Sequence, residues 1–197
     1  QNLIGREVSL DLRAALREAA ALLPVPADEA AQTAVLDFIV GRLRALLLEQ
    51  GYRYDVVEAV LAERGHDPYL AARTVADLAR WVSRDDWMDL LNAYARCVRI
   101  TREFAEIFPV HPERFVEEAT RALYDAYQQA AAQVSPDSTV DELFTAFQPM
   151  VPVINRFFDD VLVMCEDRAR RENRLGLLQR IAALPEGIVD LRKMEGF

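Results

Sequence analysis

The chain contains 197 residues, of which 52% are hydrophobic and 28% charged, and its formal net charge is −9. This balance is typical of a soluble globular protein and not of a disordered one, and apolar runs as short as residues 161–165 exclude a membrane span, which needs roughly 20 such residues. The acidic charge argues against a long basic track for nucleic acid, because non-specific affinity depends on many Lys and Arg side chains. It leaves room for a small contact that reads bases.

Hydrophobic residues recur at helical spacing along almost the whole chain, and no segment alternates long enough to predict a strand. Pro24 is expected to end the first helix, and Pro149 and Pro152 to bend or interrupt a later one. Gly51 and Gly65 stand where a helix end favours a left-handed residue. The expected helices, in chain order, cover residues 10–23, 28–50, 54–64, 68–82, 86–104, 111–134, a bent helix from 139, 167–184, and a short terminal helix with Arg192 and Lys193.

The expected fold is therefore all-α, a helical bundle of about eight to nine helices. Ser83 with Asp86, and Ser138, are expected to cap the helices that follow them. Because the sequence starts with Gln and not Met, residues 1–26 are interpreted as a linker helix that leads from an N-terminal body outside this sequence. Residues 27–197 are then expected to form one helical domain.

No motif in the sequence predicts a catalytic centre or a metal site. His66 and His111 each stand beside a proline at an expected helix start, without a second ligand at metal-binding spacing, and are interpreted as turn residues. The chain has neither a glycine-rich phosphate loop nor a nucleophile elbow. Cys97 and Cys165 are isolated, so neither a disulfide framework nor a cysteine metal site is supported, and a reducing cytoplasm is expected.

Acidic and aromatic residues have structural interpretations. Asp85 and Asp86 fall in a first helical turn, where the helix dipole favours negative charge. Asp159 or Asp160 is expected to pair with an arginine of the helix over 167–184. Four phenylalanines recur near helical spacing and are expected in the core: Phe144, Phe147, Phe157 and Phe158.

Arginines form two sets at helical spacing. Of the 23 basic residues only Lys193 is a lysine, and Arg is the better side chain for planar or stacking recognition, although a genome rich in G and C produces the same bias. Three-residue steps place each set on one arc of its helix, where it can bind a ligand. The alternative is that each set lies on a solvated helix face and forms ion pairs with nearby acidic side chains. The first set is Arg96, Arg99 and Arg102, and the second is Arg168, Arg171 and Arg174 with Arg170 beside them.

Three stretches carry a family resemblance: residues 36–62, residues 92–100, and residues 157–164 followed by 171–178, where Phe-Phe-Asp-Asp-Val-Leu-Val-Met precedes Arg-Glu-Asn-Arg-Leu-Gly-Leu-Leu. In this order they resemble the bacterial glycyl-tRNA synthetase beta subunit, whose C-terminal region is a DALR-type anticodon-binding domain. Together the stretches span most of residues 10–193.

The resemblance implies a non-catalytic part of an enzyme that attaches glycine to its tRNA with ATP. The alpha subunit would hold the aminoacylation site, so no cofactor is expected in this chain. Its implied partners are tRNA-Gly, the alpha subunit and the rest of the beta subunit, with no membrane and no DNA. Glycine anticodons end in two cytosines, and an arginine working with a carboxylate can read a cytosine. The expected tRNA-binding residues are Arg96, Arg99, Arg102, Arg171 and Arg174.

Two other interpretations stay open from sequence. The chain can be a helical scaffold that holds subunits together through an exposed apolar face, without reading bases itself. It can also be the related helical domain of another synthetase, such as the arginine enzyme, which fits the residues 157–178 less well. For Arg171 and Arg174, a structural role at the bundle end is an equal alternative to RNA contact.

Overall fold

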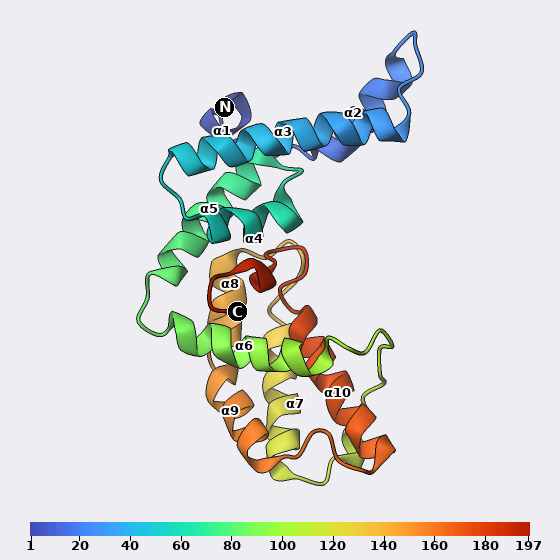
Figure 1. Cartoon of the computed structure of the whole chain (residues 1–197), viewed down its shortest axis with the longest axis vertical. Coiled ribbons are helices and arrows are strands. Elements are labelled where there is room, and N and C mark those ends of the chain that lie inside the picture. Colours follow the sequence, from blue (N-terminus) through green and yellow to red (C-terminus); the bar gives the residue numbers. More distant parts are fainter. The chain divides into compact units, whose positions relative to one another are not determined.

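The computed structural model describes all residues from 1 to 197 and contains ten α-helices, two 3-10 helices and no strand (Figure 1). The all-α prediction is confirmed. The number of α-helices exceeds the expected eight to nine because a short helix, α1 (Asn2–Gly5), was not expected, and because the helix from Thr139 is divided in two. No helix combines the length and the apolar character that crossing a bilayer requires.

The chain folds into two compact units. Unit 1 comprises Gln1–Ser83 with Gly187–Glu195, and unit 2 comprises Arg84–Glu186 with Gly196–Phe197. The expected boundary between residues 26 and 27 concerns a body outside this chain and stays a prediction. Besides α1, the elements of unit 1 are α2 (Leu12–Leu22), α3 (Glu29–Glu49), α4 (Tyr54–Arg64), α5 (Pro68–Val82) and the 3-10 helix η2 (Leu191–Lys193).

Unit 1 has its core around α4 and α5, where Val56, Val60 and Val75 are fully buried. Arg64 is only 2% exposed, and its Nε donates to the Gly187 carbonyl at 3.0 Å. This bond ties the returning segment 187–195 to α4, since a buried guanidinium needs partners for its N–H groups. By contrast, α2 buries no residue at all.

The two glycines at helix ends in unit 1 differ. Gly51 has a φ of 89°, so the expected left-handed residue after α3 is confirmed. The same expectation for Gly65 is wrong, because its φ is −57°. Glycine is required there for space instead: an added Cβ would lie 2.6 Å from the Leu61 carbonyl oxygen.

Unit 2 packs five helices around a core that combines aromatic and aliphatic side chains. Trp87 meets Phe144 edge to face, with ring centroids 5.5 Å apart, and Phe144, Phe147 and Phe157 are buried as expected. The fourth phenylalanine, Phe158, is only half-buried, so the prediction of a core position is wrong for it. The elements of unit 2 are α6 (Trp87–Thr101), the 3-10 helix η1 (Pro112–Arg114), α7 (Glu118–Ala131), α8 (Val140–Phe147), α9 (Met150–Asp160) and α10 (Arg168–Ala183).

Helix boundaries in unit 2 follow local chemistry, with two corrections. Thr139, and not Ser138, caps α8, because its hydroxyl accepts from the Glu142 N–H in a capping box. Asp86 occupies the N-cap of α6 without bonding its backbone, since its carboxylate accepts from the Arg84 guanidinium at 2.8 Å. The expected break at Pro149 is confirmed, because Pro149 is the N-cap of α9.

The segment that follows α6 was not predicted correctly. The helix expected from residue 111 is a single 3-10 turn, and α7 begins only at Glu118. Side chains of α10 bind this backbone: Asn173 exchanges two hydrogen bonds with the N–H and carbonyl of His111, and Gln179 accepts from the Phe108 N–H at 3.0 Å. These tertiary bonds satisfy the backbone groups that a helix would otherwise pair.

Candidate nucleic-acid interface

The arginines of α6 form a row on the solvent side of the helix. The opposite face of α6 buries Leu91, Tyr94 and Cys97 in the core of unit 2. Arg99 and Arg102 are exposed, and the side chain of Arg96 is 39% exposed. Arg99 lies in the last turn and Arg102 is the C-cap, where positive charge is favoured by the helix dipole. The position at the helix end therefore favours Arg99 and Arg102.

Arg96 is held against α9 by three neighbours. Its guanidinium carbon lies 4.4 Å from the centroid of the Phe158 ring, and Nη1 donates to Asn155 Oδ1 at 3.1 Å. Nη2 lies 3.8 Å from Asp159 Oδ1, which is longer than a hydrogen bond. The stacking and the single hydrogen bond fix the plane of the guanidinium while part of it stays in contact with solvent.

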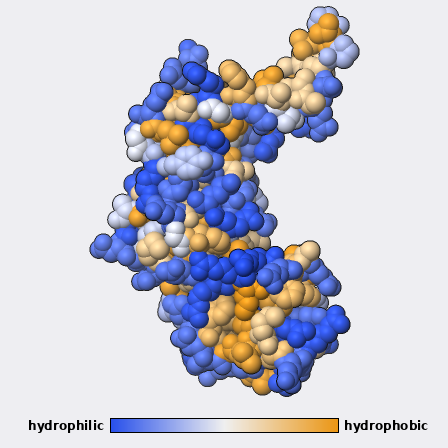
Figure 2. All heavy atoms as spheres, in the orientation of Figure 1, coloured by the Kyte–Doolittle hydropathy of each residue, from blue (hydrophilic) through white to orange (hydrophobic).

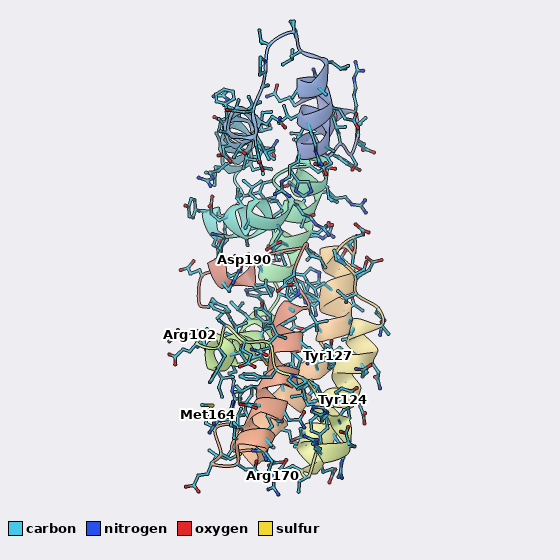
Figure 3. All side chains as sticks on the ribbon, turned by 90° about the vertical axis from the view of Figure 1, so that its right-hand side faces the viewer. Arg102, Tyr124, Tyr127, Met164, Arg170 and Asp190 are labelled. Atoms are coloured by element: carbon cyan, nitrogen blue, oxygen red, sulfur yellow. The ribbon has the colours of Figure 1, made fainter.

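The remaining two arginines of the row are less constrained. The Arg99 guanidinium lies 5.6 Å from the ring centroid of Phe197. Arg102 makes no ion pair and no side-chain hydrogen bond, and Figure 3 shows it projecting from the same side of unit 2 as Met164. Both can therefore turn toward a ligand at little cost in broken contacts.

An apolar surface accompanies the row. Leu162 and Met164, in the segment between α9 and α10, are 74% and 50% exposed. Figure 2 shows polar side chains along α6 and an apolar area of the same unit beside it, over the α9–α10 segment. Cations next to exposed apolar side chains suit a ligand with both phosphates and flat bases. We call the α6 arginines, Phe158, Leu162 and Met164 together the α6–α9 face.

The arginines of α10 do not form an equivalent row. Arg168 pairs with Glu172 at 2.6 Å and Arg170 with Asp167 at 3.3 Å. Arg171 is half-buried and donates to the Cys165 carbonyl at 3.2 Å. Each of these guanidiniums is used within its own helix or the segment before it, whereas Arg99 and Arg102 of α6 make no ion pair.

Arg174 is the most enclosed arginine of α10. It is 6% exposed, and its guanidinium binds Glu117 at 2.6 Å and the Leu162 carbonyl at 2.9 Å. The expectation that Asp159 or Asp160 pairs with an arginine of this helix is wrong, because Glu117 takes that place and Asp160 pairs with Arg156 on α9 at 3.3 Å. The structure thus places Arg174 as a tie between α10 and the start of α7.

The Arg174–Glu117 pair changes the titration of the carboxyl. Burial alone would raise the pKa of Glu117, but its own backbone N–H, the Arg174 guanidinium and the Thr120 hydroxyl together lower this pKa below its ordinary value. These contacts together favour the charged carboxylate over its protonated form.

Cysteine and histidine side chains add no chemistry to the α6–α9 face. Burial raises the pKa of the Cys97 thiol to about 12, so it stays protonated at neutral pH. His66 lies in the turn between α4 and α5, and His111 precedes η1, as expected for turn residues. No group of three His, Cys, Asp or Glu side chains is placed to hold a metal ion.

Sequence reasoning found the α6 arginines but missed their partners on α9. Asn155 and Asp159 were not singled out as contacts of Arg96, and Phe158 was expected in the core. A signal was present: Asn155, Phe158 and Asp159 stand at positions i, i+3 and i+4, which share one helix face. Only the packing of α9 against α6 shows that this face meets the arginine row.

A surface that combines a row of arginines with exposed apolar and aromatic side chains is the kind of protein surface that binds single-stranded RNA. The chain belongs to the DALR anticodon binding domain family, whose model matches residues 90–190. The match begins within α6 and extends past α10, so it includes the whole α6–α9 face.

The chain is similar to several glycine–tRNA ligases. It is 35% identical over 206 residues to the glycine–tRNA ligase beta subunit of Myxococcus xanthus, covering 98% of this chain and 29% of the relative. The beta subunit of Desulforudis audaxviator is 36% identical over 199 residues, with 97% and 28% covered. The chloroplastic/mitochondrial glycine–tRNA ligase 2 of Arabidopsis thaliana is 30% identical over 199 residues, with 100% and 19% covered. The chain thus spans between a fifth and three tenths of these relatives.

Proposed function

We propose that this chain recognises the anticodon arm of tRNA-Gly as the non-catalytic, C-terminal part of a glycine–tRNA ligase beta subunit. The family match to an anticodon binding domain and the names of the relatives support this assignment. The observation that carries it is the α6–α9 face, where exposed arginines lie beside the half-exposed Phe158 ring.

The α6–α9 face suits an RNA loop for physical reasons. Bases in an anticodon loop are unpaired, so they can leave the stack and lie on Arg planes, aromatic rings or apolar side chains. Such stacking contributes about 1–3 kcal/mol per base. Arg99 and Arg102, whose guanidiniums make no ion pair, can meet the phosphates between those bases.

The acidic chain makes this recognition selective. With a net charge of −9, the protein repels nucleic acid in general, so binding depends on the few cations of the α6–α9 face. The two phosphate contacts expected for Arg99 and Arg102 on a single strand predict a slope of about −1.4 for the logarithm of affinity against the logarithm of salt concentration. The shallow slope distinguishes this face from a long basic track.

In the whole ligase, the chemistry would take place on other chains. We propose that the alpha subunit joins glycine to tRNA-Gly with ATP, and that this chain, with the rest of the beta subunit, orients the tRNA so that its acceptor end reaches that site. This chain would need no cofactor of its own. The two free cysteines, Cys97 and Cys165, are compatible with action in a reducing cytoplasm.

A titration of the 197-residue chain with a glycine anticodon stem-loop tests the proposal. The comparison is a stem-loop in which both anticodon cytosines are replaced by adenines, at the same moderate salt concentration. We expect the natural loop to bind at least roughly tenfold more tightly. Equal affinity for both loops, or no binding to either at low salt, would contradict base recognition.

A second candidate function is attachment of unit 1 to another part of the ligase. It is favoured by the exposed apolar side chains of α2 and α3, where Leu22 is 87% and Phe38 70% exposed. Large apolar side chains exposed on one helix pair are typical of interaction surfaces. Replacing Phe38 by Asp should then prevent co-purification with the remaining ligase chains without changing stem-loop affinity; unchanged co-purification would exclude this role.

A further inference from the structure

We infer that Asp159 selects cytosine over uracil in a base-reading site that it forms with Arg96, on the platform of Phe158. The inference rests on the proposed function, since it assigns the substrate chemistry of the same α6–α9 face. It extends that function by naming a carboxylate, and not an arginine, as the residue that discriminates between the two pyrimidines.

Arg96 is held in one orientation by residues of α9. Its guanidinium lies 4.4 Å from the Phe158 ring centroid and donates to Asn155 Oδ1 at 3.1 Å. The ring fixes the plane of the guanidinium, and the amide fixes its rotation within that plane. The side chain nevertheless keeps 39% of its surface exposed. A ligand therefore meets a donor whose orientation costs no further entropy.

The carboxylate of Asp159 lies near the Arg96 guanidinium without accepting a hydrogen bond from it. Its Oδ1 lies 3.8 Å from Arg96 Nη2, beyond hydrogen-bond distance. No other side chain or backbone N–H donates to it, and its side chain is 73% exposed. The carboxylate thus keeps its acceptor capacity next to a fixed donor. The two groups form an open donor–acceptor pair with a gap between them.

The donor of Arg96 and the acceptor of Asp159 together match the pairing edge of one base. The pairing edge of cytosine carries an amino donor beside two acceptors, N3 and O2. Asp159 can accept from the amino group while Arg96 donates to an acceptor. In uracil a carbonyl oxygen replaces the amino group and N3 carries a hydrogen. In the pose of cytosine, uracil would therefore place its carbonyl oxygen against the carboxylate and its N3–H against the guanidinium, and neither contact can form a hydrogen bond. The same site therefore favours cytosine and disfavours uracil.

Asn155 acts as a positioning residue in this arrangement. It touches the guanidinium of Arg96 through Oδ1 and lies one helical turn before Asp159 on α9. Without this acceptor, Arg96 can rotate over the ring and lose its alignment with the base. We therefore expect Asn155→Ala to reduce the preference for cytosine while leaving the stability of the fold unchanged.

Unit 2 offers a matched control for Asp159. Asp160 is the next residue on the same helix and has a 52% exposed side chain, but it faces Arg156, 3.3 Å away. Replacing either aspartate by asparagine removes one negative charge from the same region and increases general attraction to RNA equally. A difference between the two variants therefore reports a contact with the base and not a change of net charge.

The experiment measures the affinity of the 197-residue chain for three glycine stem-loops. The first keeps both anticodon cytosines, the second has uracils in their place, and the third has adenines. For the unmodified chain and for Asp160→Asn we expect the cytosine loop to bind at least roughly fivefold more tightly than the uracil loop. For Asp159→Asn we expect this ratio to fall to nearly one. Thermal unfolding of all variants checks that they fold alike.

The outcomes separate this inference from the proposed function. If Asp159→Asn keeps the cytosine preference, or if Asp160→Asn loses it to the same extent, Asp159 is not the selecting residue. If the unmodified chain prefers the natural loop over the adenine loop but binds the uracil loop equally, the inference fails and anticodon recognition stands. If all three loops bind equally, both fail.

Discussion

The two arginine sets of unit 2 have the same spacing along their helices and different surroundings in the fold. On α6, Arg99 and Arg102 make no ion pair, and Arg96 is aligned by neutral Asn155 and the Phe158 ring, with the Asp159 carboxylate 3.8 Å away. On α10, every guanidinium is occupied: Arg168, Arg170 and Arg174 pair with carboxylates, and Arg171 with a backbone carbonyl. Cations that lack a carboxylate partner are available to a ligand, whereas paired cations stabilise the fold.

The difference has a physical cause in the neighbouring segments. The residues before α10 run back along it and present the carbonyls of Leu162 and Cys165 to its arginines. A buried guanidinium needs such acceptors because an unpaired buried charge is costly. Arg99 and Arg102 on α6 are exposed to solvent, so they need no protein acceptor. Periodicity predicts which residues share a helix side, but the segment opposite decides their role.

The largest expected effect is on stability, from removing the enclosed arginine. Arg174→Ala leaves the Glu117 carboxylate without its arginine partner and should lower the free energy of unfolding by about 3 kcal/mol. This value is near the low end for a broken buried ion pair, because the side chain of Glu117 is 30% exposed. Urea unfolding measures the change. The control is Arg168→Ala, which removes an exposed ion pair and should hardly move the midpoint; an equal loss in both variants would contradict the comparison.

The next effect is on RNA affinity. Arg96→Ala removes the aligned guanidinium from the α6–α9 face and should weaken binding of the natural glycine stem-loop roughly tenfold, within the range for one specific base contact. Its stability should fall by about 1 kcal/mol, because the stack on Phe158 and the hydrogen bond to Asn155 are lost. Arg170→Ala on α10 is the matched control, and a similar loss of affinity there would show that α10 also binds the RNA.

A smaller effect should follow from the free arginine at the end of α6. Arg102→Ala is expected to reduce affinity only a few-fold and for all loop sequences alike, because a phosphate contact carries no base information. The salt dependence should become shallower by about 0.7 in slope. Titrations at several salt concentrations measure this change. An unaltered slope would mean that Arg102 does not meet a phosphate.

The smallest effect concerns pH. Because the folded-state pKa of Glu117 is lowered below its ordinary value of 4.5, its contribution to stability is present above the unfolded pKa and is lost as the pH falls through the folded pKa. The difference in unfolding free energy between the unmodified chain and Glu117→Gln should therefore be largest near neutral pH and should shrink below about pH 4.5. Urea unfolding at a series of pH values tests this, and a difference that grows on acidification would refute it.

Much of the fold could be predicted where signals are local. The helix over 54–64 is observed with the same bounds, and the one opened by Asp67 and Pro68 begins and ends where expected. There the start and stop chemistry lies within the helix ends themselves. The segment 103–117 could not be predicted, because its backbone is bound by Asn173 and Gln179, which follow the residues they bind by 62 and 71 positions.

The candidate site was predictable in part for the same reason. Helical spacing indicates that Arg96, Arg99 and Arg102 share one side of α6, but it cannot show that α9 brings Phe158 and Asp159 beside them. The motif residues Asn173, Arg174 and Gly176 have structural roles that spacing does not reveal: an added Cβ on Gly176 would lie 2.6 Å from the Phe108 carbonyl oxygen.

The most direct test of RNA binding at the α6–α9 face is photo-cross-linking of the 197-residue chain to a glycine stem-loop that carries 4-thiouridine next to the two anticodon cytosines. Cleavage after arginine separates residues 157–168, with Phe158 and Met164, from the fragments of α10. We predict that the cross-link falls in residues 157–168 or in α6. A cross-link confined to α10 or to unit 1 would contradict the account.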